Sequence, residues 1–164
     1  MNIRLLLSVM LIALVFSVAP ARQEGAPPAT VHAKFDPTRD PARDLKDAIA
    51  LAQKTGRRIL LDVGGEWCIW CHRLDSLYIR NPELDKYLND HYVVVKVNVS
   101  KENKNEAFLA QYPKIPGYPH LFVLDSDGKF LHSQDTGVLE SGKGHDPAKV
   151  LGFLQEWAKP VKKL

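Results

Sequence analysis

The spacing of apolar positions changes repeatedly along the chain, and each change predicts an element of secondary structure. From residue 41 to residue 55, apolar side chains recur at helical spacing. Asp40-Pro41 is a favourable start for this helix, and Gly56 is a favourable end. Residues 58–63 form a short apolar run bounded by glycines, which favours a buried strand.

The later segments continue this alternation. Further helices are expected over residues 68–80, 82–89, 102–112 and from 147 onward. Further strands are expected over residues 92–99, 120–124 and 129–132, with a weak edge strand over 31–35. Helices that alternate with strands require a central sheet covered on both faces, and the last hairpin adds antiparallel strands to it. The predicted fold class is therefore α/β, with a central mixed β-sheet flanked by helices on both faces.

The first 21 residues have the three-part layout of a secretory signal peptide. Arg4 precedes an apolar run over 5–18, and Ala19-Pro20-Ala21 supplies small residues for cleavage. The run is shorter than the roughly 20 residues that a membrane-spanning helix needs, although an uncleaved anchor is the alternative interpretation. Residues 22–39 are then expected to form a tether with the weak edge strand, and residues 40–164 a single domain.

Composition and charge narrow the class of protein. The chain of 164 residues carries 22 Lys and Arg against 19 Asp and Glu, for a net charge of +3. So small an excess, with the two signs intermixed, argues against a nucleic-acid-binding protein. Two cysteines are too few for a disulfide scaffold. We expect a compact enzyme or binding domain, monomeric, in the periplasm or another exported compartment.

The candidate chemistry lies in Cys68-Ile69-Trp70-Cys71. In an exported chain these two cysteines can form one local disulfide. At the start of a helix, backbone N–H groups and the helix dipole favour thiolate over thiol, so Cys68 is the expected nucleophile. Cys71 follows one turn later, where it can resolve a mixed disulfide on Cys68. The predicted activity is thiol–disulfide exchange with the cysteine pair as the redox centre and no cofactor.

The same residues allow other interpretations. A purely structural disulfide is one, although a bridge that encloses so few residues constrains the unfolded chain little. Together with His72 the cysteines spell C-x-x-C-H, the attachment motif for c-type haem. A non-catalytic binding or metal-handling module is another, although the chain has no second C-x-x-C to complete a four-thiolate site.

Residues 58 to about 158 resemble the thioredoxin superfamily. The features that carry the resemblance are a strand ending in Asp62 before Trp67-Cys68-x-x-Cys71, a strand with Lys96, the loop Gly117-Tyr118-Pro119 and the hairpin 121–130. Within the superfamily, the segment 81–84 is similar to the C-terminal periplasmic domain of the DsbD family of membrane electron transporters. The chain departs from thioredoxin at Ile69-Trp70, where thioredoxin has Gly-Pro, and at His72, where it has lysine.

The resemblance implies roles for two charged residues. Asp62 would lie buried in its strand, where burial favours a protonated carboxyl, and would exchange a proton with Cys71 through water. Lys96 would pair with Asp62, and an outward-facing strand lysine is the alternative. Asp62 and Lys96 are therefore candidate catalytic residues beside Cys68 and Cys71.

The resemblance also implies a surface for peptide binding. Pro119 would follow a cis peptide bond and would present the backbone of Tyr118 to an extended peptide. An apolar rim for a substrate protein would come from Trp67, Ile69, Trp70 and Tyr118. His120 is expected at the surface without a role.

Partners follow from the resemblance as well. The substrates would be proteins that contain disulfides, and a membrane electron donor of the DsbD type would restore the dithiol. Ile69 and Trp70 offer no charge to stabilise a thiolate, which favours reduction of substrates over their oxidation. The predicted function is an exported thiol–disulfide oxidoreductase that reduces substrate disulfides.

Overall fold

The computed structural model describes residues 32–159, so the expected signal peptide and most of the expected tether lie outside the described residues. The main helices are α1 Pro41–Thr55, α2 Ile69–Arg80, α3 Pro82–His91, α4 Glu106–Leu109 and α5 Pro147–Trp157. The main strands are β1 Arg58–Gly64, β2 Tyr92–Asn98, β3 His120–Leu124 and β4 Phe130–Asp135. Before α5 come a 3-10 turn, η1 Thr136–Leu139, and a small hairpin of β5 Glu140–Ser141 and β6 Gly144–His145. Among the described residues, no helix has the length and apolar character needed to cross a membrane.

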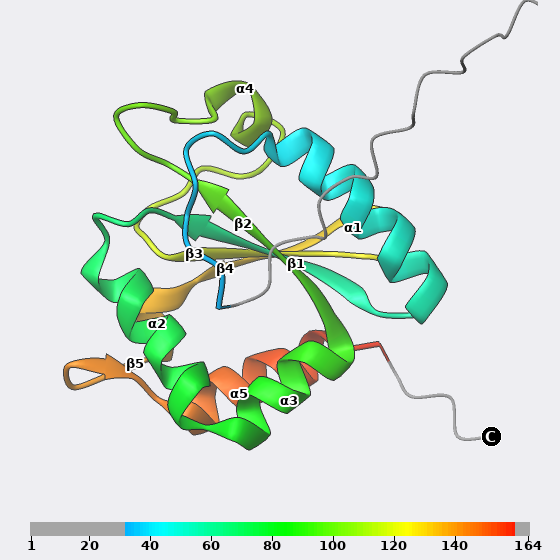
Figure 1. Ribbon diagram of the computed structural model, residues 1–164. Coiled ribbons are helices and arrows are strands. Elements are labelled where there is room, and N and C mark those ends of the chain that lie inside the picture. The colour runs from blue at the N-terminus through cyan, green and yellow to red at the C-terminus, as the bar shows by residue number, and fades with distance from the viewer. Residues whose placement is uncertain (1–31, 160–164) are drawn as a thin grey trace, which may run out of the picture.

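The four main strands form one mixed sheet in the order β2-β1-β3-β4. Strand β1 runs parallel to β2 and antiparallel to β3, and β4 runs antiparallel to β3. Helices α1 and α4 cover one face, and α2, α3 and α5 cover the other (Figure 1). The predicted α/β class, with a mixed sheet flanked on both faces, is therefore confirmed.

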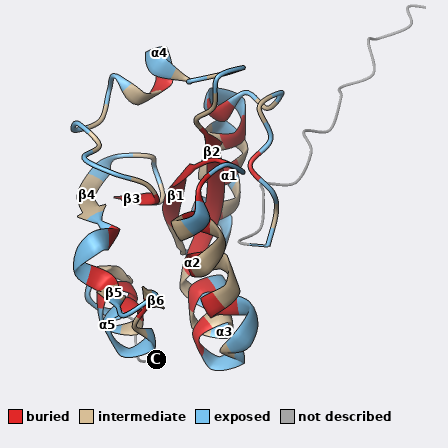
Figure 2. Ribbon diagram, turned by 90° about the vertical axis from the view of Figure 1, so that its left-hand side faces the viewer, coloured by how far each residue is buried: buried red, intermediate tan, exposed pale blue. Residues whose placement is uncertain are grey.

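Alternation along β1 divides the core into two apolar clusters. Ile59, Leu61 and Val63 pack on the face of α1, whereas Leu60 packs on the face of α2. Asp62 follows the same alternation, so its side chain belongs to the face of α2. Figure 2 looks onto the end of the sheet where α2 begins, with buried residues lining the inside of both layers. A charged residue is thereby placed inside the core, directly under the N-terminus of α2.

Helix starts and ends follow local chemistry where the sequence predicts them. The Asp40 side chain caps α1 by accepting hydrogen bonds from the backbone N–H groups of Ala42 and Arg43. Gly56 ends this helix in the left-handed conformation, with φ of 74°. Asp146 caps α5 as Asp40 caps α1. The start and end of α1 and the start of α5 therefore lie where the sequence predicts them.

Two expectations about secondary structure are wrong, and one small hairpin was missed. The helix expected over 102–112 shrinks to the four residues of α4, because side-chain amides compete with the helical backbone. Asn103 accepts from the backbone of Asn105, and Asn105 takes a left-handed conformation with φ of 51°. Residues 32–35, the described part of the expected edge strand, form turns and irregular backbone. The hairpin β5–β6 was not predicted, since two-residue strands carry no readable alternation.

Candidate active site

The two cysteines lie where β1 leads into α2. Cys68 is the N-cap of α2, with extended backbone, and its Sγ accepts a hydrogen bond from the N–H of Cys71 at 3.1 Å. The two sulfurs form a disulfide across a Cα–Cα distance of 5.2 Å. Cys68 is 4% exposed and Cys71 is 1% exposed, so Cys68 offers the more accessible sulfur. Once the disulfide is reduced, the same N–H would stabilise a thiolate on Cys68.

Close packing around Cys71 requires a residue without a side chain at the end of β1. A Cβ on Gly64 would lie 2.5 Å from Cys71 Sγ and 3.0 Å from Cζ of Phe35. Phe35 is 2% exposed and packs against both cysteines, and its backbone N–H donates to Glu66 Oε1 at 2.8 Å. Sequence reasoning missed the role of Phe35, which lies at the end of the expected weak edge strand.

A buried ion pair lies in the sheet beneath the cysteines. Asp62 and Lys96 stand opposite each other in the register of β1 and β2, and Lys96 Nζ donates to Asp62 Oδ2 at 2.7 Å. The two residues are 2% and 3% exposed. Of the two interpretations of Lys96, the structure therefore supports the inward one. Asp62 Oδ1 has no hydrogen-bond partner among the described residues and is the oxygen available for proton exchange.

A second carboxylate, on α2, completes this charged cluster. Lys96 Nζ also donates to Asp75 Oδ1 at 2.5 Å. Burial and the nearby charge of Asp62 raise the pKa of Asp75 to about 6, because one ammonium cannot neutralise two carboxylates. Sequence reasoning missed Asp75. The available signal was its helical spacing, since it follows Cys71 by four residues and so lies on the same face of α2.

The predicted apolar rim divides into an exposed and a packed part. Trp67 and Ile69 are 60% and 58% exposed, so both are available to a partner. The rings of Trp67 and Tyr118 pack edge to face, with 5.6 Å between their centroids. Trp67 Nε1 also donates to the carbonyl of Val99 at 2.6 Å, which fixes the indole.

Trp70 is half-buried beside the hairpin that precedes α5. The guanidinium of Arg73 lies 4.4 Å from its ring centroid, and the ring of His145 meets it edge-on at 5.7 Å. His145 is buried, and this burial lowers its pKa. No role is assigned to this histidine from the sequence. Trp70 therefore serves the packing of α2 more than the open rim.

The loop before β3 has the predicted geometry. The Tyr118–Pro119 peptide bond is cis, and the carbonyl of Pro119 accepts from Thr136 Oγ1 at 2.6 Å. The expectation for the next residue is wrong, because His120 is 1% exposed and bonds to Ser133 Oγ at 2.8 Å. Burial also lowers the pKa of His120. Every residue of the central strand β3 is buried, because both faces of the sheet are covered. His120 is therefore buried whichever face its side chain lies on.

Comparison with known proteins places this site in a family. A family model described as thioredoxin-like matches residues 40–126, more than half of the chain. The chain belongs to this thioredoxin-like family. The thioredoxin-like match includes both cysteines, Asp62, Lys96 and the cis-proline loop.

Several thioredoxin-like relatives have names that refer to disulfide chemistry. The chain is 27% identical over 129 residues to the thiol:disulfide interchange protein DsbD of Pseudomonas fluorescens, covering 78% of this chain and 20% of that protein. It is 30% identical over 80 residues to the disulfide bond reductase DsbH of Chlamydia pneumoniae, covering 44% of this chain and 48% of that protein. The chain thus spans about a fifth of the length of the first relative and about half of the second.

Solved structures agree with the thioredoxin-like fold. A disulphide isomerase from Xylella fastidiosa Temecula1 superposes with a TM-score of 0.63 at 26% identity, covering 74% of this chain and 94% of that chain. The oxidised C-terminal domain of DsbD from Neisseria meningitidis superposes with a TM-score of 0.54 at 24% identity, covering 76% of this chain and 99% of that chain. The Cys68–Cys71 pair has the spacing of a redox-active C-x-x-C.

Proposed function

We propose that this protein is an exported thiol–disulfide oxidoreductase that reduces disulfides in substrate proteins. One observation carries the proposal, namely a Cys68–Cys71 disulfide at the N-cap of α2 with a backbone N–H directed at Cys68 Sγ. The names of the relatives agree with this chemistry. Export, to the periplasm or an equivalent compartment, rests on the layout of residues 1–21.

The reaction is two successive exchanges. The Cys68 thiolate attacks one sulfur of the substrate disulfide, so that this bond breaks, one substrate thiolate leaves and a mixed disulfide forms. Cys71 then loses its proton and attacks Cys68 Sγ, which releases the second substrate thiolate and forms the Cys68–Cys71 bond. Two electrons pass from the protein to the substrate, and two protons end on the substrate thiols.

Proton transfer from Cys71 is assigned to the charged cluster below it. Asp62 lies on the face of β1 that Gly64 turns toward Cys71, and its Oδ1 has no hydrogen-bond partner among the described residues. Lys96 holds Asp62 in place through Oδ2. We assign Asp62 as the proton acceptor, through water, and Lys96 and Asp75 as the residues that set its charge.

Substrate binding is assigned to the rim and the cis-proline loop. The backbone of Tyr118, ahead of Pro119, would pair with an extended segment of the substrate. Trp67 and Ile69 would contact apolar side chains on either side of the substrate cysteine. The oxidised protein then requires a dithiol donor, for which we propose a membrane electron donor of the DsbD type.

The reduction of insulin by dithiothreitol, followed by turbidity, tests this function. The wild-type protein should accelerate the reaction, and Cys68→Ala should abolish the acceleration. Cys71→Ala should accumulate a mixed disulfide between Cys68 and the insulin chain, detectable by mass spectrometry. Full acceleration by Cys68→Ala, or a mixed disulfide formed only by Cys68→Ala, would reverse the assignment of nucleophile and resolving thiol.

A further inference from the structure

A groove runs from the active-site tryptophan along the segment that follows β2. It consists of two adjoining hollows that share Val99 and Lys104. One hollow, of about 420 Å³, lies between Trp67 and residues 99–101. The other, of about 440 Å³, continues past α4 to Tyr118. Since Trp67 precedes Cys68 and Tyr118 precedes the cis-proline, the groove is continuous with the proposed peptide-binding site.

The apolar part of this groove is held in place before any partner binds. Trp67 is tied to the Val99 carbonyl through Nε1 and packs edge-on against Tyr118. Gly65 leaves room for the indole, because a Cβ there would lie 2.5 Å from Trp67 Nε1. A rigid aromatic surface that is 60% exposed can contact a partner with little loss of side-chain entropy.

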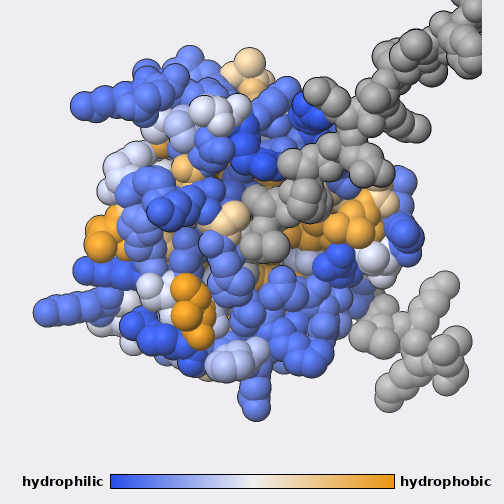
Figure 3. All heavy atoms as spheres, viewed as in Figure 1, coloured by the Kyte–Doolittle hydropathy of each residue, from blue (hydrophilic) through white to orange (hydrophobic). Residues whose placement is uncertain are grey.

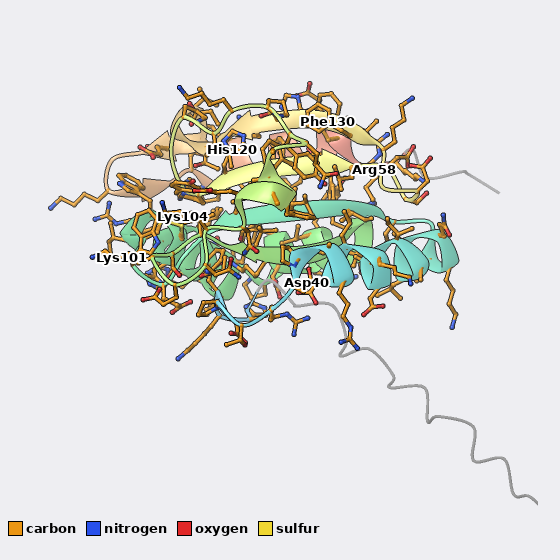
Figure 4. The ribbon with its side chains drawn as sticks, turned by 90° about the horizontal axis from the view of Figure 1, so that it is seen from above. Asp40, Arg58, Lys101, Lys104, His120 and Phe130 are labelled. Carbon is orange, nitrogen blue, oxygen red and sulfur yellow. A yellow bond between two sulfur atoms is a disulfide. The ribbon has the colours of Figure 1, made fainter. Side chains whose placement is uncertain are left out.

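The rim of the groove is positively charged. Lys101, Lys104 and Lys114 line the two hollows and are exposed, and Glu106 is the one acidic side chain among the described residues that line them. Lys104 Nζ lies 3.6 Å from Glu106 Oε1, a solvated contact. The neighbouring carboxylate of Glu102 lies near Lys101, so three ammonium groups face two exposed carboxylates here. Figure 4 shows Lys101 and Lys104 near the same end of the molecule, away from Arg58 at the start of β1.

We propose that this groove receives an acidic segment of the substrate protein, with an apolar side chain next to the reactive cysteine and Asp or Glu residues beside it. The apolar side chain packs on Trp67, and the acidic residues face Lys101, Lys104 and Lys114. This inference rests on the proposed function and adds the class of substrate. Charge complementarity of this kind raises the rate of encounter and selects among partners.

Single-turnover reduction of synthetic peptides tests the inference. Three peptides share one internal disulfide and a neighbouring leucine, and their flanking residues are Asp and Glu, Asn and Gln, or Lys and Arg. The pre-reduced wild-type protein should reduce the acidic peptide about tenfold faster than the basic one at low ionic strength. In about 1 M salt, where the Debye length is about 3 Å, the two rates should converge.

Charge-reversal variants show whether the groove is responsible. Lys101→Glu with Lys104→Glu should invert the acidic-to-basic rate ratio, and Lys101→Gln with Lys104→Gln should bring it close to one. A matched control is Lys54→Glu with Lys129→Glu, which makes the same change of charge on exposed lysines at the other end of β1 and should keep the wild-type preference. Because the acidic-to-basic rate ratio is taken within each variant, a general loss of activity does not change it.

The outcomes separate this inference from the proposed function. If the wild-type protein fails to reduce hydroxyethyl disulfide, a small uncharged substrate, the proposed function itself is wrong. If it reduces that compound but shows no preference among the peptides, the groove does not select acidic segments. A preference that survives Lys101→Glu with Lys104→Glu also overturns the inference.

Discussion

At the scale of single residues, the site is governed by an imbalance of charge beneath the disulfide. Asp62 and Asp75 share the single ammonium of Lys96, and all three groups are largely removed from water. If both carboxylates were ionised, the cluster would carry one uncompensated negative charge, and burial makes such a charge costly. The cluster therefore tends to hold a proton, which suits a site that must take up and release one with each exchange.

Asp75 should make folding stability depend on pH. Its pKa is raised in the folded protein to about 6, above its ordinary value of 3.8. The folded state therefore holds a proton that the unfolded chain has already lost, so stability falls as pH rises between about 4 and 6. With a discount for partial exposure, urea unfolding of the oxidised protein should show a loss of about 1–2 kcal/mol over this range.

Asp75→Asn should remove this component of the pH dependence, and the exposed control Asp127→Asn should retain it. The comparison uses the difference between each variant and the wild type, which cancels the titration of other groups. Equal slopes for the wild type and Asp75→Asn from pH 4 to 7 would contradict the raised pKa.

Asp62→Asn should slow the resolving step and leave the fold intact. An amide can still accept the hydrogen bond of Lys96, but it cannot take the proton of Cys71. We expect release of the second substrate thiol to slow by about tenfold to a hundredfold. Rapid-mixing kinetics with a mixed-disulfide intermediate measures this step directly. A release rate unchanged across pH 6 to 9 would leave Asp62 with a structural role only.

At the scale of elements, the site is the junction of β1, β2 and the first turn of α2. Register between the parallel strands brings Asp62 to Lys96, and the end of β1 brings Gly64 under Cys71. The helix contributes Cys68, Cys71 and, one turn further, Asp75. The two strands and the helix together therefore fix the distances between the cysteines and the charged cluster.

Gly64→Ala should destabilise the protein at this junction. The added methyl group would overlap Cys71 Sγ and the ring of Phe35, and overpacking of this kind costs about 1–3 kcal/mol. The matched control is Gly117→Ala, where a Cβ meets no atom within 4 Å. Urea unfolding should separate the two variants, and equal stabilities would show that the strand end relaxes freely.

Elements with strong local chemistry could be predicted from the sequence. Aspartate caps, the left-handed Gly56 and the Asp125–Gly128 turn depend on neighbours in the chain, and all occur as expected. The helix expected over 102–112 is reduced to a single turn by side-chain amide bonds that helical spacing does not reveal, such as that of Asn105 Nδ2 to the Asn98 carbonyl at the end of β2.

The candidate site also has residues that could be predicted from the sequence and residues that could not. Cysteine spacing led to Cys68 and Cys71, and the resemblance to the thioredoxin superfamily led to Asp62 and Lys96. Phe35 and Asp75 were missed because tertiary packing brings them to the site. Nothing in the local sequence around Phe35 indicates that its ring lies 4.5 Å from Lys96 Nζ.

At the scale of the whole molecule, the chemistry lies at one end of the sheet. Figure 3 shows separate apolar patches on a largely polar face. The cysteines at the start of α2 pack beside Tyr118 of the cis-proline loop, and the lysine-lined groove begins at the neighbouring Trp67. Concentration of reactive and recognition groups at one end suits a protein that passes electrons between two macromolecular partners in turn.

The reduction potential of the Cys68–Cys71 pair tests the central claim most directly, because it decides whether the pair donates or accepts electrons. Ile69 and Trp70 place no charge between the cysteines, so the thiolate gains little extra stabilisation and the dithiol should be a good donor. Equilibration with thiol–disulfide buffers should give a value nearer the roughly −270 mV of thioredoxin than the roughly −120 mV of a strong periplasmic oxidant. A value above about −160 mV would contradict the account and identify a donor of disulfides.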